Sequence, residues 1–271
     1  MKIKRVILFG DRSKRNVQVV WQRVSSVLKR NGFEIVSADK GVRGDIALVI
    51  GGDGMVLKSA RLLYGKGIPV LGINTGQMGF LSEVSAHETK NLKEYLKKGR
   101  ILLEKRDALQ CRIKRDKKQI FTGYAMNDVV IKAESAARVI DLLLKIDSNP
   151  VANYVVDGLI VSTTTGSTAY SLAAGGPIVE PPCQVFLVTP VSPHSLNLRP
   201  LVLSNKRELT VVVRKNHSRI VLALDGQKHF PVKIGDVIII TRAGRPVIIA
   251  HTGRYSFYSR LKEKFGWSQR G

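Results

Sequence analysis

The sequence predicts two folded domains, an N-terminal α/β domain with a parallel sheet and a C-terminal all-β sandwich. The chain has 271 residues, which exceeds the length of about 100–200 residues that is common for one domain. Near Ile101 the pattern changes from alternating strand and helix segments to a series of short strands. Hydrophobic residues make up 44% of the chain, so both domains can bury a core.

The first domain, residues 1–103, alternates apolar strands with amphipathic helices. Short apolar runs bounded by Gly or Pro predict buried strands at 5–10, 33–38, 45–52 and 68–74. Apolar residues at helical spacing predict helices at 17–29 and 55–65. This order predicts a Rossmann-like parallel sheet with helices on both faces.

The second domain, residues 104–254, is rich in short strands. The segments 109–114 and 119–131 are joined by a charged turn, which predicts a hairpin. Six further apolar segments with short polar or glycine connections follow, a pattern typical of a β-sandwich. The tail, residues 255–271, begins with an aromatic-rich segment at 255–267 that predicts a helix packing back on another element.

The chain is strongly basic, with 44 Lys and Arg residues against 21 Asp and Glu residues and a formal net charge of +23. Such a charge first suggests a nucleic-acid partner. However, residues 149–198 contain no Lys or Arg, and aromatic residues make up only 6% of the chain, which weakens a stacking surface for bases. A diffuse positive charge would instead attract anionic small molecules.

Several classes of protein are excluded by composition. No window holds the ~18 uninterrupted apolar residues of a membrane span, and the N-terminal apolar run is too short for a signal peptide, so a cytoplasmic protein is expected. Only Cys111 and Cys183 occur, which excludes a disulfide scaffold. The five His residues lack metal-ligand spacing, so no metal-ligating residue is predicted.

A glycine-rich turn, Gly51-Gly52-Asp53-Gly54, follows one predicted strand and precedes a predicted helix. Backbone N–H groups of such a turn can bind an anion at the helix start. A carboxylate among them could accept a proton from a nucleophilic hydroxyl or hold a metal ion. The alternative is an ordinary turn in which Asp53 caps the helix.

A second glycine turn, GINTG at 72–76, follows the next strand of the predicted sheet. Because the carboxyl ends of parallel strands lie at the same edge, both turns should face the edge where open α/β folds bind ligands. Phe80 lies just beyond and could pack against a flat ring, or could be an ordinary core aromatic.

Asn127 and Asp128 interrupt the apolar segment AMNDVVI. Polar side chains in a buried strand need partners. An adjacent amide and carboxylate can bind the two vicinal hydroxyls of a ribose. An Asx-turn or bulge at a strand start is an equally good interpretation.

The segment 157–177, DGLIVSTTTGSTAYSLAAGGP, contains only hydroxyl residues and one glycine from Ser162 to Thr168, followed by a short helix-like stretch. Hydroxyls and backbone amides at a helix start can bind polar or phosphate-bearing ligands. The alternative is a set of turns in which the hydroxyls bind the loop's own backbone. The density of hydroxyls favours ligand binding.

Taken together, these motifs resemble the NAD kinase family. The resemblance runs in order through GGDG, GINTGQMGFL, AMNDVVI, DGLIVSTTTGSTAYSLAAGGPI, PHSLNLRPLVL, DGQ and FYSRLKEKFGW. It implies phosphoryl transfer from ATP or polyphosphate to the adenosine-ribose 2′-hydroxyl of NAD, giving NADP, with Mg²⁺ or another divalent cation. It also implies a tail that returns to the first domain, and a homodimer or homotetramer whose sites are completed across subunits, with no membrane or specific nucleic-acid partner.

The resemblance also implies roles for individual residues. Asp53 would be the catalytic proton acceptor, with Gly54 beside it. Asn127 and Asp128 would hold the adenosine ribose, and Tyr170 would lie near a base ring. Further substrate contacts would come from Leu57, Lys58, Phe80, Arg138, Asp157, Thr165, Thr168, Ala169, Ser171, Ala173 and Gln227.

Four positions depart from the family pattern. Met55 stands where Thr is common after GGDG, and Asp128 stands where Glu is frequent. Thr164 replaces a frequent Pro, and Val155 occupies a position that is basic in some relatives. These departures bear on the preference for donor and acceptor, not on the class of reaction.

The sequence alone leaves two alternative functions open. Lipid or sugar kinases can share a GGDG loop, although the ribose-sized Asn127-Asp128 pair argues against a lipid acceptor. A basic nucleic-acid-binding protein with a nucleotide-like fold would instead show steeply salt-dependent binding.

Overall fold

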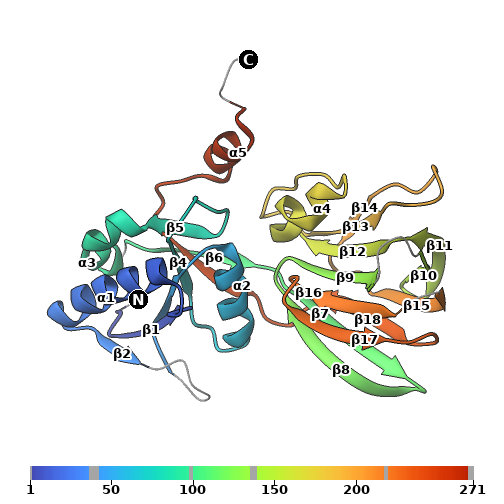
Figure 1. Ribbon diagram of the computed structural model, residues 1–271, viewed down its shortest axis with the longest axis horizontal. Helices are drawn as coiled ribbons and strands as arrows, with labels where there is room; N and C mark the ends of the chain where they lie inside the picture. Colours follow the sequence, from blue (N-terminus) through green and yellow to red (C-terminus); the bar gives the residue numbers. More distant parts are fainter. Residues whose placement is uncertain (1, 37–42, 98–99, 135–138, 217–218, 268–271) are drawn as a thin grey trace. The chain divides into compact units, whose positions relative to one another are not determined.

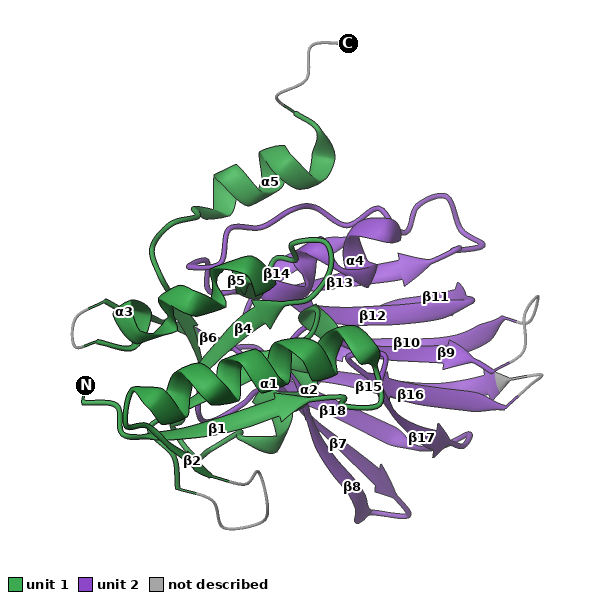
Figure 2. Ribbon diagram, turned by 60° about the vertical axis from the view of Figure 1, so that its left-hand side comes forward, with its two compact units in different colours: residues 1–105, 247–271 green, residues 106–246 purple. Residues whose placement is uncertain are grey.

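The computed structural model describes residues 2–36, 43–97, 100–134, 139–216 and 219–267. The chain divides into two compact units (Figure 2). Unit 1 comprises residues 1–105 and 247–271, and unit 2 comprises residues 106–246. Unit 1 is the predicted α/β domain and unit 2 the predicted all-β domain.

Unit 1 is built on a seven-stranded sheet with the order β2-β1-β3-β4-β19-β6, and β5 also pairs with β4 (Figure 1). The pairs among β1 to β5, and the pair of β19 with β4, are parallel. All four strands predicted in the first domain are confirmed. The strands are β1 (Arg5–Gly10), β2 (Glu34–Val36), β3 (Ile46–Ile50), β4 (Val70–Asn74), β5 (Ser82–Ser85), β6 (Leu102–Arg106) and β19 (Val247–His251).

Helices lie on both faces of this sheet. One face packs its alternate strand residues, such as Leu48, against α1 (Arg15–Arg30) and α3 (Leu92–Leu96), which follows a 3₁₀ turn, η1 (Ala86–Asn91). On the other face α2 (Asp53–Leu62) contacts β1, β3 and β4. The arrangement of helices is confirmed.

Unit 2 contains two six-stranded antiparallel sheets, with the orders β11-β10-β15-β18-β7-β8 and β14-β13-β12-β9-β16-β17. Alternate residues of the strands form one shared apolar core, in which Tyr154 and Phe186 are the largest fully buried side chains. The first sheet contains β7 (Leu109–Arg115), β8 (Lys118–Ala125), β10 (Ile140–Ile146), β11 (Asn149–Val156), β15 (Leu209–Asn216) and β18 (Val237–Arg242). The second contains β9 (Asp128–Ala133), β12 (Gly158–Thr163), β13 (Val185–Val191), β14 (Leu201–Ser204), β16 (Ile220–Leu224) and β17 (Lys228–Val232).

Two segments that the sequence presents as single strands are divided between the sheets. The predicted strand 119–131 is β8 in one sheet and β9 in the other, and the chain crosses at Met126-Asn127. The apolar segment that contains Asp157 is likewise divided between β11 and β12. Polar interruptions thus mark the places where the chain changes sheets.

The predicted boundary at residue 254 differs from the division in the structure. Residues 247–251 form β19, which pairs with β4 in the sheet of unit 1. Their apolar, alternating sequence fits either kind of sheet, so only the strand partner decides the unit to which they belong.

The C-terminal helix α5 (Phe257–Phe265) packs back on unit 1, as predicted. Its Leu261 and Arg260 are buried, and its Phe265 ring lies 6.2 Å from the ring of Phe80. Ser256 caps the helix by accepting a hydrogen bond from Ser259 N (3.1 Å). Within the described ranges, no helix is both long and apolar enough to cross a membrane.

Candidate functional site

The GGDG turn connects the end of β3 to the start of α2. Gly51 has a φ of +151°, a conformation that favours glycine. Gly52 is the N-cap residue, and no side chain caps the helix. The alternative in which Asp53 is a helix cap is therefore wrong.

The Asp53 carboxylate binds the loop that precedes β5. Its Oδ2 accepts a hydrogen bond from Phe80 N (2.7 Å), and its Oδ1 accepts from Leu81 N (3.1 Å) and Ser82 N (3.2 Å). The Ser82 hydroxyl donates a further bond to Oδ1 (3.0 Å). A Cβ atom at Gly79 would lie 2.0 Å from Asp53 Oδ1, so only glycine fits there.

The second glycine turn lies at the same edge of the sheet as the first. β4 ends at Asn74, whose side chain donates to Gly76 O (2.8 Å) and accepts from Gly76 N (3.1 Å). Because β3 and β4 are parallel neighbours, both turns follow carboxyl ends of strands, as predicted. Of the two contacts expected on α2, Lys58 is exposed and Leu57 is buried.

Unit 2 contains a cavity of about 300 Å³ that brings together residues from three segments. Four of its lining residues are candidates from the sequence, and they come from the Asn127-Asp128 pair and from the end of the hydroxyl-rich loop. Three others come from the turn between β16 and β17 and the start of β17. The lining includes Asn127, Asp128, Ala169, Tyr170, Asp225, Gly226 and His229.

Asp225 organises the wall of this cavity and was not predicted as a site residue. Its Oδ1 accepts hydrogen bonds from Asn127 N (2.7 Å) and Asp128 N (3.3 Å), and its Oδ2 accepts from Met126 N (3.2 Å). Asp225 has a φ of +49° and begins the Asp-Gly turn after β16. The signals in the sequence were this turn, which is equally typical of an ordinary hairpin, and the DGQ motif of the family resemblance, in which Asp225 stands first.

Two polar groups of the cavity are poorly satisfied by the protein itself. Burial, together with the negative charge of Asp225, raises the pKa of Asp128 to about 7. Asn127 Oδ1 is buried, and none of the described residues donates a hydrogen bond to it. A ligand with two neighbouring hydroxyl groups would offer the donors that these oxygen atoms need.

The hydroxyl-rich loop uses most of its hydroxyls in hydrogen bonds to backbone carbonyls, some within the loop and some in neighbouring segments. Thr163 Oγ1 donates to Met126 O (2.6 Å), Ser167 Oγ donates to Thr164 O (2.7 Å), and Thr168 Oγ1 donates to Thr165 O (3.3 Å). This is the pattern of the alternative interpretation, in which the loop binds its own backbone. The loop therefore forms a rigid element, η2 (Thr165–Thr168), ahead of the short helix α4 (Tyr170–Ala173).

The other candidates in unit 2 are distributed unevenly. Thr165 accepts a hydrogen bond from Arg106 (3.3 Å), and Ser171 pairs with Thr189 (2.8 Å), so both hydroxyls have protein partners. Ala173 and Gln227 are exposed. Asp157 lies at the other end of β12 from the hydroxyl-rich loop and does not line the cavity. Arg138 lies outside the described residues.

Comparisons with known proteins identify the family. A family model described as the ATP-NAD kinase N-terminal domain matches residues 11–101, and one described as the C-terminal domain matches residues 126–252. The chain belongs to the NAD kinase family. An NAD kinase of Nitratidesulfovibrio vulgaris is 41% identical over 88% of this chain and 84% of its own length. An NAD kinase of Koribacter versatilis is 35% identical over 99% of this chain and its own full length.

Solved structures of NAD kinases and related enzymes share the fold. A yeast NADH kinase complexed with NADH aligns with a TM-score of 0.85 at 22% identity, covering 100% of this chain and 90% of the yeast chain. An NAD kinase from Archaeoglobus fulgidus in complex with ATP aligns with a TM-score of 0.76 at 26% identity, covering 97% of this chain and 98% of the Archaeoglobus chain.

Gly166→Ala should destabilise unit 2, because a Cβ atom there would lie 2.2 Å from Asn127 O. Moving the Asn127 backbone to make room should lower the free energy of unfolding by about 1–3 kcal/mol. Urea unfolding followed by circular dichroism measures this change. Gly244→Ala is the matched control, because that position has open space and should change stability by no more than about 0.5 kcal/mol. Equal values for the two variants would contradict the steric argument.

Asp128 should make stability fall as the pH rises. The unfolded chain releases this proton near pH 4, whereas the native protein holds it to about pH 7. The contribution of Asp128 to the free energy of unfolding should therefore decrease between about pH 4 and pH 7. Asp128→Asn should remove on the order of 2–4 kcal/mol of that decrease, measured by denaturant unfolding across the pH range. Asp116→Asn, at an exposed turn, controls for the loss of one charge. Equal pH slopes for Asp128→Asn and the parent would contradict the assignment.

Proposed function

We propose that the chain transfers a phosphoryl group from ATP or polyphosphate to the adenosine-ribose 2′-hydroxyl of NAD, giving NADP. The family models and the NAD kinase relatives support phosphorylation of NAD. They give no support to a lipid kinase, a sugar kinase or a nucleic-acid-binding protein. The observation that carries the proposal is the unit 2 cavity, with its unsatisfied Asn127 amide oxygen and buried Asp128 carboxyl group.

In this proposal Asn127 and Asp128 bind the hydroxyls of the adenosine ribose. Asn127 Oδ1, to which none of the described residues donates, and the buried Asp128 carboxyl group offer oxygen acceptors to the cavity, so a diol is favoured over an apolar group. Tyr170 is exposed at the cavity and presents a ring on which a base can stack. The small side chain of Ala169 leaves room for the base beside the Tyr170 ring.

Asp53 is the proton acceptor in the proposed reaction. A carboxylate offers about four lone-pair positions. Among the described residues, three hydrogen bonds are donated to Oδ1, whereas one, from Phe80 N, is donated to Oδ2. Oδ2 is therefore the atom with capacity for the substrate hydroxyl. The N–H donors keep the carboxylate oriented, so little reorganisation is needed when the proton moves.

The phosphate donor would bind at the amide groups of the GGDG turn, where a helix start favours anions. Mg²⁺ supplies charge neutralisation for the transferring phosphoryl group when it is bound. Among the described residues, no group of three or more His, Cys, Asp or Glu side chains could hold a metal ion. This fits a cation that arrives with the donor's phosphates, because Mg²⁺ often uses few protein ligands.

Asp157 has a different place in the proposal. It lies away from the unit 2 cavity of its own chain, which agrees with the expectation that a second subunit completes the site. A homodimer or homotetramer, and a cytoplasmic location, stay predictions.

The reaction itself is tested by measuring NADP formation with the purified chain. ATP and polyphosphate are supplied separately as donors, and NAD and NADH separately as acceptors. We expect NADP from NAD and ATP. The absence of phosphorylated dinucleotide with either donor would refute the proposed function.

Asp53→Asn should lower kcat by about 10²–10⁴-fold, because general-base assistance is lost. NAD affinity, measured by calorimetry, should be largely unchanged. Ser82→Ala is the matched control, since it removes one donor to the same carboxylate but keeps the base, and kcat should change only severalfold. A kcat for Asp53→Asn close to that of the parent would remove Asp53 from the mechanism.

A further inference from the structure

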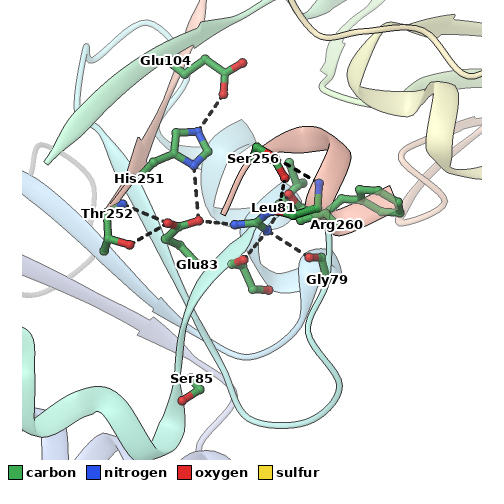
Figure 3. A network of polar contacts seen from close by, with 12 residues as sticks. Gly79, Leu81, Glu83, Ser85, Glu104, His251, Thr252, Ser256 and Arg260 are labelled. Carbon is green, nitrogen blue, oxygen red and sulfur yellow. Dashed lines mark hydrogen bonds and ion pairs between the residues drawn. The ribbon is translucent and has the colours of Figure 1, made fainter. Parts of the chain in front are cut away.

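The C-terminal helix inserts a buried arginine beneath the loop that binds Asp53. We call residues 79–82 the 79–82 loop. Arg260 of α5 is only 5% exposed. Its Nη1 donates to Gly79 O (3.0 Å), Phe80 O (3.0 Å) and Ser82 O, and its Nη2 donates to Glu83. Figure 3 shows these contacts converging on one guanidinium group.

The same peptide groups contact Arg260 on one side and Asp53 on the other. The carbonyl of Gly79 and the N–H of Phe80 belong to one peptide unit, and the carbonyl of Phe80 and the N–H of Leu81 belong to the next. In a trans peptide the C=O and N–H bonds point in opposite directions. Arg260 holds both carbonyls, and the Asp53 carboxylate accepts from both N–H groups.

Each of these two peptide units therefore bridges a positive guanidinium group and a negative carboxylate. Hydrogen bonds in such a chain polarise one another, which strengthens the N–H donors. The bridge also fixes the plane of each peptide, and so fixes the position of the Asp53 oxygens. Arg260 thus bears on the orientation of Asp53 without touching it.

Arg260 is itself held by a buried polar network. Glu83 is 1% exposed and accepts hydrogen bonds from Thr252 N (3.0 Å) and Thr252 Oγ1 (2.7 Å). His251 lies 3.6 Å from Glu83 and 2.7 Å from Glu104. Burial raises the pKa of Glu83, but bonds with His251 and Thr252 and the charge of Arg260 outweigh it, so the pKa lies below its usual value. Glu83 is thus an ionised anchor for the guanidinium group.

We infer that Arg260 is a positioning residue for phosphoryl transfer, which acts on Asp53 through the 79–82 loop. This inference rests on the proposed function, in which Asp53 is the proton acceptor. It assigns the C-terminal helix a part in the chemistry, in addition to its part in the fold. Arg260 should therefore affect kcat more than the KM for NAD.

Arg260→Gln should lower kcat by about 10–100-fold, since small displacements of a reacting group cost this much. The KM for NAD should stay within about threefold. Arg260→Lys keeps the charge but lacks the planar fork, so it should restore part of the lost kcat. Leu261→Ala is the structural control, because it removes a buried apolar side chain of the same helix and should lower Tm while leaving kcat of the folded enzyme near that of the parent.

A double-mutant cycle decides whether Arg260 acts through Asp53. If it does, Arg260→Gln should cost little further kcat in the Asp53→Asn background. An equal fold-loss in both backgrounds, or a kcat for Arg260→Gln within twofold of the parent, would overturn the inference. If Arg260→Gln does not fold, Arg260→Lys completes the same cycle. An unchanged kcat for Asp53→Asn alone would instead refute the role of Asp53, so the two failures are distinguishable.

Discussion

In each unit, one carboxylate that accepts three consecutive backbone N–H groups organises the candidate site. Asp53 binds the N–H groups of residues 80–82 in unit 1, and Asp225 binds those of residues 126–128 in unit 2. Successive N–H groups that point the same way form a concave anion site. The chain fills both sites with its own carboxylates, and these fix the loops from which the candidate residues project.

The strand and helix pattern of the first domain could be predicted because buried strands and amphipathic helices leave periodic signals. The partner of a strand leaves no such signal, so the sequence assigned 247–251 to the second domain, whereas β19 pairs with β4 in the sheet of unit 1, and it presented 119–131 as one strand. Asn127 and Asp128 could be found because polar residues interrupt an apolar run. Asp225 and Arg260 could not, because one begins a common turn and the other is a cation in an amphipathic helix, and their partners lie about 100 and 180 residues away in the chain.

The hydroxyl-rich loop was recognised from its sequence, but its side chains have a different role from the expected one. The sequence favours hydroxyls that bind a ligand, whereas in the structure they bind the protein itself. Its hydroxyls close bonds within the loop and to neighbouring carbonyls, and Gly166 leaves no space for a Cβ atom beside Asn127. The loop therefore holds Ala169 and Tyr170 in place without itself needing a ligand. Binding to such a rigid element costs little conformational entropy. The polar groups that stay available to a ligand at the cavity are the Asn127 amide oxygen and the Asp128 carboxyl group.

That division between satisfied and unsatisfied groups has an energetic consequence. Asp128 is buried beside a second carboxylate, and Asn127 Oδ1 is buried with no donor in the part of the chain that the structure describes. Both features oppose folding, and polar groups in such positions persist where they contribute to function. A bound diol would donate to these oxygens, relieve the missing hydrogen bond and stabilise the ionised form of Asp128. These interactions would stabilise the complex, so the cavity favours a ribose over any ligand of similar size that has no adjacent hydroxyls.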